Sequence, residues 1–473
     1  MKRIAIIGGG ISGLSAAFAI EKQKRSGLPV EYVLYEASGQ FGGVLRTEKV
    51  DGCIVEAGPD SFLTEKSWAA DFCREIGIGD QLISSNDAER KTYILVNGRL
   101  LPLPDGLMFM VPTEILPVVF SPLFSLHTKL CMAREWFSAP RNSPDESVAQ
   151  MVERHYGAEM VERLAEPLLS GVYGGEASQL GVRSVLPRFA EMESQYGSLG
   201  KAMLAARKKS IASGLAKPIF TSLKNGMQQL VDALSLQLDQ RSLRAKTSVT
   251  ALQRTESAWS VSTPNRSENF DGVILASPAP NASSLLHDAA PALSQKLGDI
   301  AYTSSITVAL GYGNEVRSPL PPGFGFLVPR SEGKSLLAAT FVHNKFPFRA
   351  PGDRALIRCF LGGARQEQTL EMPDEKILSR VRDELRQILG ISAEPIFTRI
   401  YRWKSAMAQY NVGHVERVQR IDALCSQIPT LALAGNAYRG IGIPDCIRSG
   451  ENAAARVLAG VGIASVEQKT SAS

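Results

Sequence analysis

The sequence contains few of the residues that build metal centres and disulfide frameworks. It has six cysteines and five histidines in 473 residues. No two cysteines form a CxxC motif, and no two histidines lie close together in the chain. Structural metal sites and disulfide scaffolds place their ligands at much closer spacing. We therefore expect free thiols in a reducing cytoplasm, and we expect no metal ion.

A hydrophobic run long enough to cross a membrane is missing as well. The apolar stretch 100–137 is interrupted by prolines, and its longest uncharged run is 115–128. A helix needs about 20 apolar residues to span a bilayer, so we expect no spanning helix here. Either the stretch makes a peripheral contact with the cytoplasmic face of the membrane, or its helices pack on their own domain and line a substrate entrance. In the first interpretation the residues at the membrane are Phe109, Phe120, Phe124 and Leu126, with Lys129 and Arg134 near the headgroups.

Positive charge is not concentrated in one region. The formal net charge is +5, and the lysines and arginines are scattered along the chain. Proteins that bind nucleic acid usually carry a basic patch, so we expect no nucleic-acid partner. With 44% hydrophobic and 21% charged residues the composition is that of an ordinary globular protein. The length predicts two or three domains.

A glycine-rich turn follows the first apolar segment. The run Ile4–Ile7 is typical of a buried strand, and a helical pattern extends from the turn to about Gln23. The turn fits the GxGxxG pattern and consists of Gly8, Gly9, Gly10, Ile11, Ser12 and Gly13. Such a turn brings backbone N–H groups and the positive end of a helix close to a pyrophosphate. It predicts a dinucleotide-binding site, and because it begins so early we expect no signal peptide.

Two further features indicate that the dinucleotide is FAD. A second strand pattern, Val30–Tyr35, is followed by Glu36 and Ala37, and Glu36 stands at the distance beyond Gly13 where a ribose-binding acid is expected. A carboxylate at this place accepts hydrogen bonds from ribose hydroxyls; the alternative is a solvated acid at a strand end. A second glycine-rich turn then brings Gly42, Gly43 and the cation Arg46. The pairing of the two turns favours FAD over NAD.

The pattern predicts an α/β protein in which a Rossmann-like FAD-binding domain is interrupted by insertions. We expect the FAD-binding domain in residues 1–75, 218–285 and 424–465. A sheet-based substrate domain is expected from 76–90, 196–217 and 286–423, a helical and membrane-associating or entrance-lining subdomain from 91–195, and a flexible tail from 466–473. Expected elements are a hairpin at 93–99, strands near 248–252, 272–276, 305–312 and 355–361, and helices at 226–240, 373–389 and 445–459.

Four segments resemble those of one enzyme family. They are EAGPDSFL at 56–63, EPLLSGVYGG at 166–175, YRWKSAMAQYNVGH at 401–414 and IGIPDCI at 441–447. On these segments the chain resembles the oxygen-dependent protoporphyrinogen and coproporphyrinogen oxidases, which belong to the monoamine-oxidase-like FAD superfamily. The first glycine-rich turn is common to that superfamily, whereas the last three segments are more specific.

The resemblance implies that FAD is bound without a covalent link, in an extended pose along both glycine-rich turns. It places a third turn, consisting of Gly58, Pro59, Asp60 and Ser61, beside the isoalloxazine ring. Val249 would lie near the adenine, and Ile441, Gly442 and Ile443 would lie near the pyrimidine edge. A turn rich in N–H groups would stabilise negative charge on a reduced flavin. A lone apolar residue such as Val249 is, however, more often part of a core.

The resemblance also implies a reaction of haem biosynthesis. A porphyrinogen would lose six electrons in three flavin reductions, and oxygen would reoxidise the flavin each time with release of hydrogen peroxide. Hydride transfer from a meso carbon to flavin N5 needs a broad apolar slot and exclusion of water more than a dedicated acid or base. We therefore assign no catalytic residue. The substrate stays open between protoporphyrinogen IX, with two propionates, and coproporphyrinogen III, with four; a homodimer is also left open.

Two residues are matched to the substrate by the resemblance. Gly171 would let the flat macrocycle approach the flavin, and the alternative is an ordinary turn glycine. Arg90 lies near the family's propionate-binding arginine, and the alternative is a solvated surface charge. His414 ends the most specific segment and is either structural or a proton shuttle. Arg439 departs from the family pattern and would serve a third or fourth carboxylate.

Other functions compete with this interpretation. A flavin amine oxidase would share both glycine-rich turns and Glu36, and a carotenoid desaturase would lack the segment from Arg402 to His414. A flavin scaffold would bind FAD without turnover. Anaerobic addition of a porphyrinogen separates these functions, because only an oxidase for that substrate bleaches the absorbance of its flavin.

Overall fold

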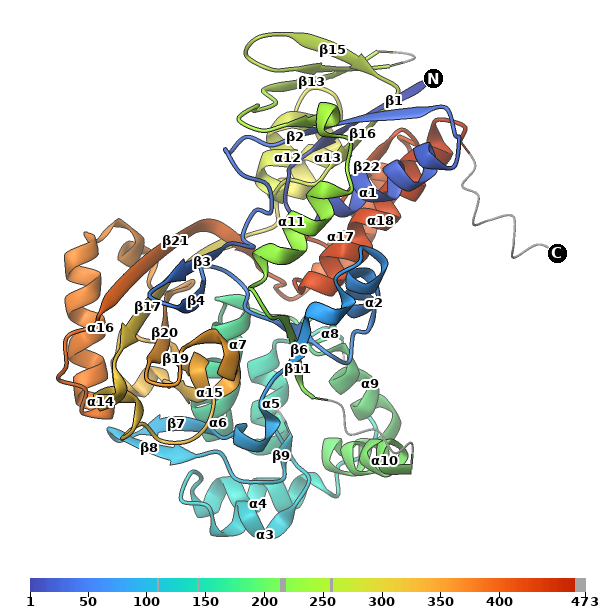
Figure 1. The fold of residues 1–473 in the computed structure, drawn as a ribbon. Coiled ribbons are helices and arrows are strands. Elements are labelled where there is room, and N and C mark those ends of the chain that lie inside the picture. Colours follow the sequence, from blue (N-terminus) through green and yellow to red (C-terminus); the bar gives the residue numbers. More distant parts are fainter. Residues whose placement is uncertain (109, 143, 213–217, 256–257, 464–473) are drawn as a thin grey trace.

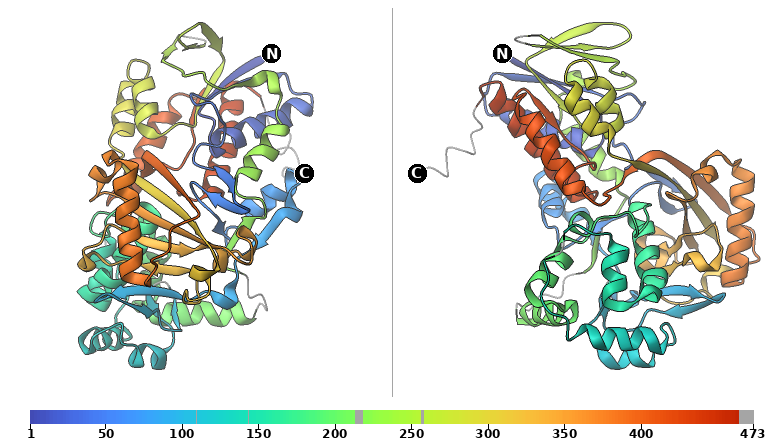
Figure 2. Two further views of the ribbon diagram at one scale, coloured as in Figure 1. Left: turned by 60° about the vertical axis from the view of Figure 1, so that its left-hand side comes forward. Right: turned by 180° about the vertical axis from the view of Figure 1, so that it is seen from behind.

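A computed structural model describes residues 1–473 except 109, 143, 213–217, 256–257 and 464–473 (Figure 1). A sheet flanked by helices lies at one end of the molecule, a group of helices lies at the other, and a second sheet lies beside them (Figures 1 and 2). This arrangement confirms the predicted α/β class. The tail at 466–473 lies outside the described residues, so its predicted flexibility stays a prediction.

The first sheet is parallel and five-stranded. Its order is β12-β2-β1-β16-β22, and every neighbouring pair is parallel. The strands, in that order, are Leu243–Arg244, Val30–Tyr35, Lys2–Ile7, Gly272–Leu275 and Leu431–Leu433. Apolar side chains alternate toward the helices α1 (Ile11–Arg25) and α18 (Ile443–Gly460), so Ile4 and Ile6 are fully buried. The sheet thus draws on three distant regions of the sequence.

Smaller elements surround this sheet. A three-stranded antiparallel sheet, β13 to β15, lies beyond it (Figure 1). The strand expected near 248–252 begins only at residue 251, and the helix expected at 226–240 is the shorter α11. The surrounding elements are β3 (Thr47–Val50), β4 (Cys53–Glu56), β5 (Phe62–Leu63), α2 (Trp68–Glu75), β6 (Leu82–Ser84), β11 (Phe220–Leu223), α11 (Gln228–Leu236), β13 (Ala251–Arg254), β14 (Trp259–Ser262), β15 (Ser267–Phe270), α12 (Ala279–Leu286), α13 (Pro291–Gly298) and α17 (His414–Ser426).

The second sheet has seven strands in the order β21-β17-β20-β19-β18-β7-β8. They are Phe397–Ala408, Tyr302–Tyr312, Ala355–Gly362, Ala338–Phe341, Gly325–Leu327, Thr92–Val96 and Arg99–Pro102. Only the pair of β18 and β7 is parallel. Helix α16 (Asp374–Leu389) covers one face, because Ile377, Val381 and Leu385 recur at helical spacing and are all fully buried. The predicted strands at 305–312 and 355–361 and the helix at 373–389 are confirmed.

The predicted hairpin at 93–99 is confirmed as β7 and β8. Asn97 and Gly98 join the two strands with φ of 50° and 73°, the left-handed conformation that a two-residue hairpin turn requires. The hairpin pairs with β18 at the edge of the seven-stranded sheet. Its strands therefore belong to the seven-stranded sheet, whereas we expected the hairpin within the subdomain 91–195. The limits of the domains stay a prediction.

Helices dominate residues 115–212. They are α3 (Ile115–Phe120), α4 (Leu126–Glu135), α5 (Val148–Tyr156), α6 (Ala158–Met160), α7 (Glu166–Tyr173), α8 (Val182–Val185), α9 (Pro187–Tyr196) and α10 (Leu199–Ala212). Figure 1 shows α3 and α4 at the end of the molecule opposite the five-stranded sheet. Proline stands inside α3 and again at residue 122, which keeps both helices short. Among the described residues, no helix combines the length and apolar character that spanning a bilayer requires.

Candidate functional site

The first glycine-rich turn has no room for a side chain at Gly8 and Gly13. Gly8 has a φ of +112°, and a Cβ on Gly13 would lie 1.9 Å from the carbonyl oxygen of Gly8. Gly10, at the start of α1, faces open space, with no heavy atom within 4 Å of an added Cβ. The first turn of α1 carries no acidic residue. A positive helix end that faces open space fits a pyrophosphate.

Glu36 lies against this turn. Its carboxylate accepts the N–H of Gly9 at 2.8 Å and the N–H of Ser38 at 2.7 Å. Each carboxylate oxygen has two acceptor positions, so both can still accept a ribose hydroxyl. Ala37 is exposed beside it. The position of Glu36 at the end of β2 therefore fits a ribose contact better than a solvated strand-end acid.

The second glycine-rich turn packs directly on the first. The N–H of Gly42 donates to the carbonyl of Gly9 at 2.8 Å, and Gly42 and Gly43 both have a positive φ. The Nε of Arg46 is buried and has no hydrogen-bond partner. No carboxylate of the described residues pairs with its guanidinium, which lies 5.8 Å from the ring centre of Trp403. An unpaired cation next to the turn fits the phosphates of a dinucleotide.

The turn of Gly58 to Ser61 continues this line of contacts. A Cβ on Gly58 would lie 1.9 Å from the carbonyl oxygen of Val44, which follows Gly43. The indole N–H of Trp403 donates to the carbonyl of Ala57 at 2.9 Å. Pro59 is exposed, while the Asp60 carboxylate forms ion pairs. The three turns therefore lie side by side.

The turn at residues 441–443, which leads into α18, lies close to the first glycine-rich turn. Gly442 precedes the first residue of that helix, Ile443, and Ile441 is partly buried. A Cβ on Gly450 would lie 2.1 Å from the carbonyl of Ser12, so α18 packs closely on α1. Val249 lies in the loop before β13 and is half-buried. Its contact with an adenine stays a prediction, as do the other proposed flavin contacts.

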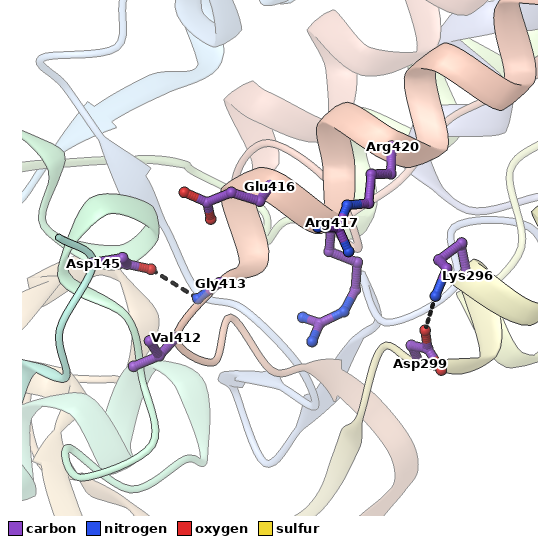
Figure 3. A pocket seen from close by; sticks show the side chains of 8 residues that line it. All are labelled: Asp145, Lys296, Asp299, Val412, Gly413, Glu416, Arg417 and Arg420. Carbon is purple, nitrogen blue, oxygen red and sulfur yellow. Dashed lines mark hydrogen bonds and ion pairs between the residues drawn. The ribbon is translucent and has the colours of Figure 1, made fainter.

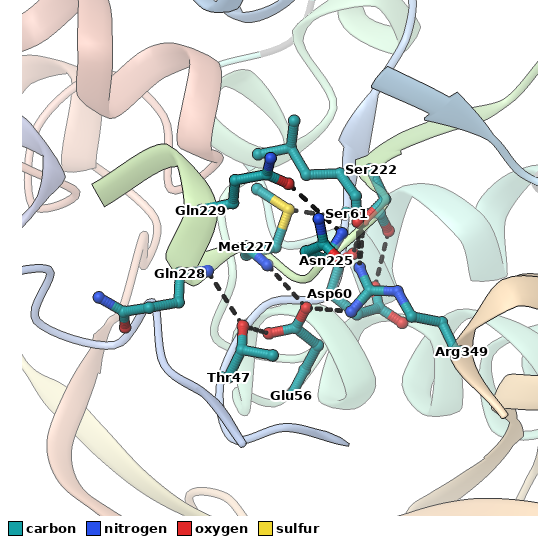
Figure 4. A network of polar contacts seen from close by, with 12 residues as sticks. Thr47, Glu56, Asp60, Ser61, Ser222, Asn225, Met227, Gln228, Gln229 and Arg349 are labelled. Atoms are coloured by element: carbon teal, nitrogen blue, oxygen red, sulfur yellow. Dashed lines mark hydrogen bonds and ion pairs between the residues drawn. The ribbon is translucent and has the colours of Figure 1, made fainter. Parts of the chain in front are cut away.

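A buried polar network behind the third turn was not predicted. Glu56 receives the guanidinium of Arg349 and the backbone N–H of Met227, and Thr47 donates its hydroxyl to Glu56 (Figure 4). Ser222 donates to the carbonyl of Asp60 at 2.6 Å. Arg349 is 1% exposed and Glu56 is 3% exposed. No local pattern indicates this pair, because its members are far apart in the chain.

Two more cations hold the third turn. The Lys345 ammonium lies 3.1 Å from both carboxylate oxygens of Asp60. Arg358 donates to the carbonyl of Gly58 and lies 3.8 Å from the Asp60 carboxylate. Burial alone would raise the pKa of Asp60, but Lys345 and Arg358 outweigh it and hold that pKa well below its usual range. Asp60 is therefore charged, and its side chain is engaged by the seven-stranded sheet and α15 (Val342–Lys345).

His414 has the surroundings of a structural residue. Its ring stacks on Tyr410 at 4.1 Å between centres, and its Nε2 lies 3.1 Å from the carbonyl of Tyr438. Burial lowers its pKa to about 4, so the imidazole is neutral near pH 7. A pocket of about 370 Å³ opens next to it, but His414 does not line that pocket (Figure 3). The lining residues are Asp145, Lys296, Asp299, Val412, Gly413, Glu416, Arg417 and Arg420.

The two residues matched to the substrate lie on neighbouring elements. Gly171 is exposed on α7, and a Cβ added to it would meet no heavy atom within 4 Å. Arg90 is exposed and directly precedes the region of β7, while α7 packs near β18, the partner of β7. Arg439 instead pairs with Asp422 at the surface. Open space at Gly171 fits a substrate slot, although the contact itself stays a prediction.

Comparison with known proteins decides the family. The sequence model for flavin containing amine oxidoreductases matches residues 11–458. The chain belongs to this family. It is 36% identical to a coproporphyrinogen III oxidase from Bacillus subtilis over 97% of this chain and 98% of that protein. It is 29% identical to a coproporphyrinogen III oxidase from Staphylococcus aureus, over 97% and 99% of the two chains.

A solved structure agrees with these sequences. The crystal structure of a proposed protoporphyrinogen oxidase from Exiguobacterium superimposes with a TM-score of 0.86 at 30% identity, covering 96% of this chain and 98% of that one. The resemblance to porphyrinogen oxidases inferred from the four segments is thereby confirmed. This member of the flavin containing amine oxidoreductases is accordingly a flavoprotein oxidoreductase.

Proposed function

We propose that this flavoprotein oxidises coproporphyrinogen III to coproporphyrin III in haem biosynthesis, with oxygen as the electron acceptor. The observation that carries the proposal is the full-length similarity to proteins named coproporphyrinogen III oxidase. This similarity favours coproporphyrinogen III over protoporphyrinogen IX. The sequence motifs alone did not decide between the two substrates. Amine oxidation, the main rival, has no comparable support, because the amine oxidases that resemble the chain do so at 15% and 17% identity and share only the fold.

We infer that the cofactor is FAD and that it is not covalently bound. The three adjoining turns and Arg46 would hold the dinucleotide, and Glu36 would accept hydrogen bonds from its ribose. Cys446 is the cysteine nearest to this site, beside Ser12, and burial raises the pKa of its thiol to about 12. A protonated thiol is a poor nucleophile, which supports non-covalent binding. When bound, the flavin supplies the two-electron chemistry and returns the electrons to oxygen.

The protein's own contribution is to position a flat, anionic substrate. The exposed Gly171 leaves space where a side chain would stand, and Arg90 supplies a positive charge for a propionate. The proposed hydride transfer needs no paired carboxylates or activated nucleophile. Placing the macrocycle against the flavin in a dry slot supplies the proximity that the reaction requires. His414 would remain a neutral structural residue rather than carry a proton.

The decisive experiment compares substrates under anaerobic conditions. Purified protein is mixed with coproporphyrinogen III, protoporphyrinogen IX or benzylamine, and the flavin absorbance is followed. We expect rapid bleaching with coproporphyrinogen III, slower bleaching with protoporphyrinogen IX and none with benzylamine. Admitting oxygen should restore the absorbance and yield fluorescent porphyrin and hydrogen peroxide. Rapid reduction by the amine alone would overturn the proposal.

A peripheral contact with the cytoplasmic face of a membrane is also proposed, through α3, α4 and the residues after them. Six large apolar side chains are exposed there: Leu116, Val119, Phe120, Leu126, Leu130 and Phe137. Arg134 is exposed among them and Lys129 is partly exposed. Phe124, which we expected at the membrane, is instead buried, and Phe109 lies outside the described residues. An apolar surface rimmed by cations suits an anionic bilayer.

A cytoplasmic location remains our proposal for the whole protein. The six cysteines are free, and five of them are buried, which suits a reducing compartment. A homodimer also stays a prediction. Sedimentation of the purified protein gives its oligomeric state directly.

A further inference from the structure

Five charged side chains form a buried cluster behind the third turn. We name Glu56, Asp60, Lys345, Arg349 and Arg358 the turn cluster. Arg349 pairs with Glu56, and Lys345 pairs with Asp60. These two pairs balance each other in charge. Arg358 is the fifth member, and no carboxylate is left for it alone.

Arg358 lies in the middle of β20 and is 5% exposed. Its nearest carboxylate oxygen belongs to Asp60, at 3.8 Å, and Lys345 already occupies that carboxylate at 3.1 Å. One of its nitrogens donates to the carbonyl of Gly58, while its Nε is buried without a partner. Burial lowers the pKa of Arg358, but an arginine stays protonated in proteins. The turn cluster therefore holds one more positive charge than negative.

A buried charge without a counter-charge is unfavourable. Ionisable groups in such perturbed surroundings cluster at functional sites. Arg358 contacts the turn of Gly58 to Ser61, beside which we propose the flavin ring. A flavin ring gains negative charge when it accepts an electron pair, and nearby protein charge tunes that step.

We propose that the excess positive charge of the turn cluster, carried by Arg358 of the seven-stranded sheet, stabilises the negative charge of the reduced flavin and so raises its affinity for electrons. Arg358 acts across the backbone of the third turn as a positioning and electrostatic residue. The inference rests on the flavin location given under the proposed function, and it does not depend on which porphyrinogen is the substrate.

The test uses sulfite as a probe on the flavin-loaded protein without substrate. Sulfite adds through its sulfur lone pair to N5 of oxidised flavin. An S–N bond forms, a flavin π bond breaks, and the electron pair becomes negative charge on the ring with no leaving group. The adduct has lost the visible absorbance of the oxidised flavin, so its dissociation constant is read directly by titration.

Arg358→Met makes the turn cluster neutral while leaving both remaining ion pairs intact. We expect its sulfite affinity to fall at least tenfold. Its two-electron reduction potential should fall by about 30 mV for each tenfold loss of that affinity. Arg358→Lys should retain affinity within about twofold. Arg386→Met is the matched control, because it removes the same charge from an exposed, paired arginine on α16 and should change neither quantity.

Lys345→Gln provides an independent variant. It also neutralises the turn cluster, because Arg358 then remains with Asp60, and we expect the same fall in sulfite affinity. Unchanged affinity in either flavin-loaded variant would overturn the inference. A wild-type protein that binds no flavin would instead overturn the proposed function, so the two failures are distinguishable. If Arg358→Met does not fold, the result with Lys345→Gln decides.

Discussion

Gly10 and Gly13 belong to the same turn, but a side chain would meet different surroundings at the two positions. At Gly13 a Cβ would collide with the backbone oxygen of Gly8 at 1.9 Å, and at Gly10 it would enter open space. Gly10 has a φ of −70°, which alanine also adopts. The two positions therefore separate the demands of the fold from those of the cofactor.

Gly13→Ala should destabilise the flavin-free protein by at least about 2 kcal/mol, because backbone cannot move away as a flexible side chain would. Gly10→Ala should leave that stability within about 0.5 kcal/mol but weaken FAD binding at least tenfold, since its methyl group occupies the space meant for the pyrophosphate. Urea unfolding and a fluorescence titration with FAD measure the two effects. Full FAD affinity in Gly10→Ala would show that the pyrophosphate lies elsewhere.

Gly171→Phe tests the substrate slot. The ring would fill the open space on α7, so kcat/KM for coproporphyrinogen III should fall at least tenfold, about 1.4 kcal/mol of transition-state binding. FAD content should be unchanged, because no proposed flavin contact involves α7. Gly171→Ala is the control and should lose much less. Equal turnover in all three proteins would remove Gly171 from the slot.

At the scale of the elements, α4, α5 and α9 meet at one buried imidazole. The ring nitrogens of His155 lie 3.3 Å from Glu135 and 3.1 Å from Glu193. Burial alone would lower the pKa of His155, but the two carboxylates outweigh it and raise that pKa. Arg154 also pairs with Glu193, and Ser198 donates to Glu135. The protonated ring thus links three helices.

This link predicts a dependence of stability on pH. The folded pKa of His155 lies above the unfolded value of about 6.5, so its contribution is fully present below that pH and is lost as pH rises through the folded pKa. Each unit of the shift is worth about 1.4 kcal/mol. Urea unfolding of wild type and His155→Gln between pH 6 and 9 should show this loss only in wild type. Parallel curves would contradict it.

The exposed apolar side chains of α3 and α4 give a second prediction at this scale. Replacing Phe120, Leu126, Leu130 and Phe137 with serine should reduce binding to anionic vesicles at least tenfold, because these side chains supply the buried area. Cosedimentation measures the binding, and activity on dissolved substrate should persist. The control replaces Leu236 and Ile396, which are exposed on other parts of the chain, and should bind like wild type. If wild type does not cosediment, the membrane proposal fails.

On the scale of the whole molecule, the pair of Glu56 and Arg349 joins β4 to the segment that leads from α15 into β20 of the seven-stranded sheet. Arg349→Met would leave the buried Glu56 carboxylate without its cation, which should cost about 3–5 kcal/mol of unfolding free energy. Arg386→Met removes an exposed pair and should cost less than about 1 kcal/mol. Chemical denaturation compares them. Equal midpoints for the two variants would mean that the pair contributes little to joining the two parts.

The residues of the first glycine-rich turn and the cations at the third turn differ in how far the sequence could predict them. Gly8, Gly13 and Glu36 belong to one strand–turn–helix–strand unit, so their spacing alone predicted that they lie together. Lys345 and Arg358 contact the third turn from a distant part of the chain, and nothing in their local sequence distinguishes them from scattered surface cations. Only the assembled fold brings them to Asp60. For the same reason the segment that ends at His414 did not predict that its ring stacks on Tyr410.

The fold shows the same division. The local sequence predicted α16, α18 and the hairpin of β7 and β8. Short strands were harder to place, since β13 begins later than expected. Pairing across long stretches of chain, as between β7 and β18, depends on the completed arrangement of the sheet and leaves little trace in either strand.

The strand order of the five-stranded sheet bears on how the protein is made. β1 and β2 leave the ribosome before β16 (Gly272–Leu275) and β22 (Leu431–Leu433), which complete the same sheet. Until then one edge of β1 stays unpaired, and the α18 side of the proposed cofactor site does not exist. Synthesis is vectorial, so a cofactor in the proposed site would be held only after α18 is made, and the nascent chain must shield an open strand edge while the residues between β2 and β16 are translated.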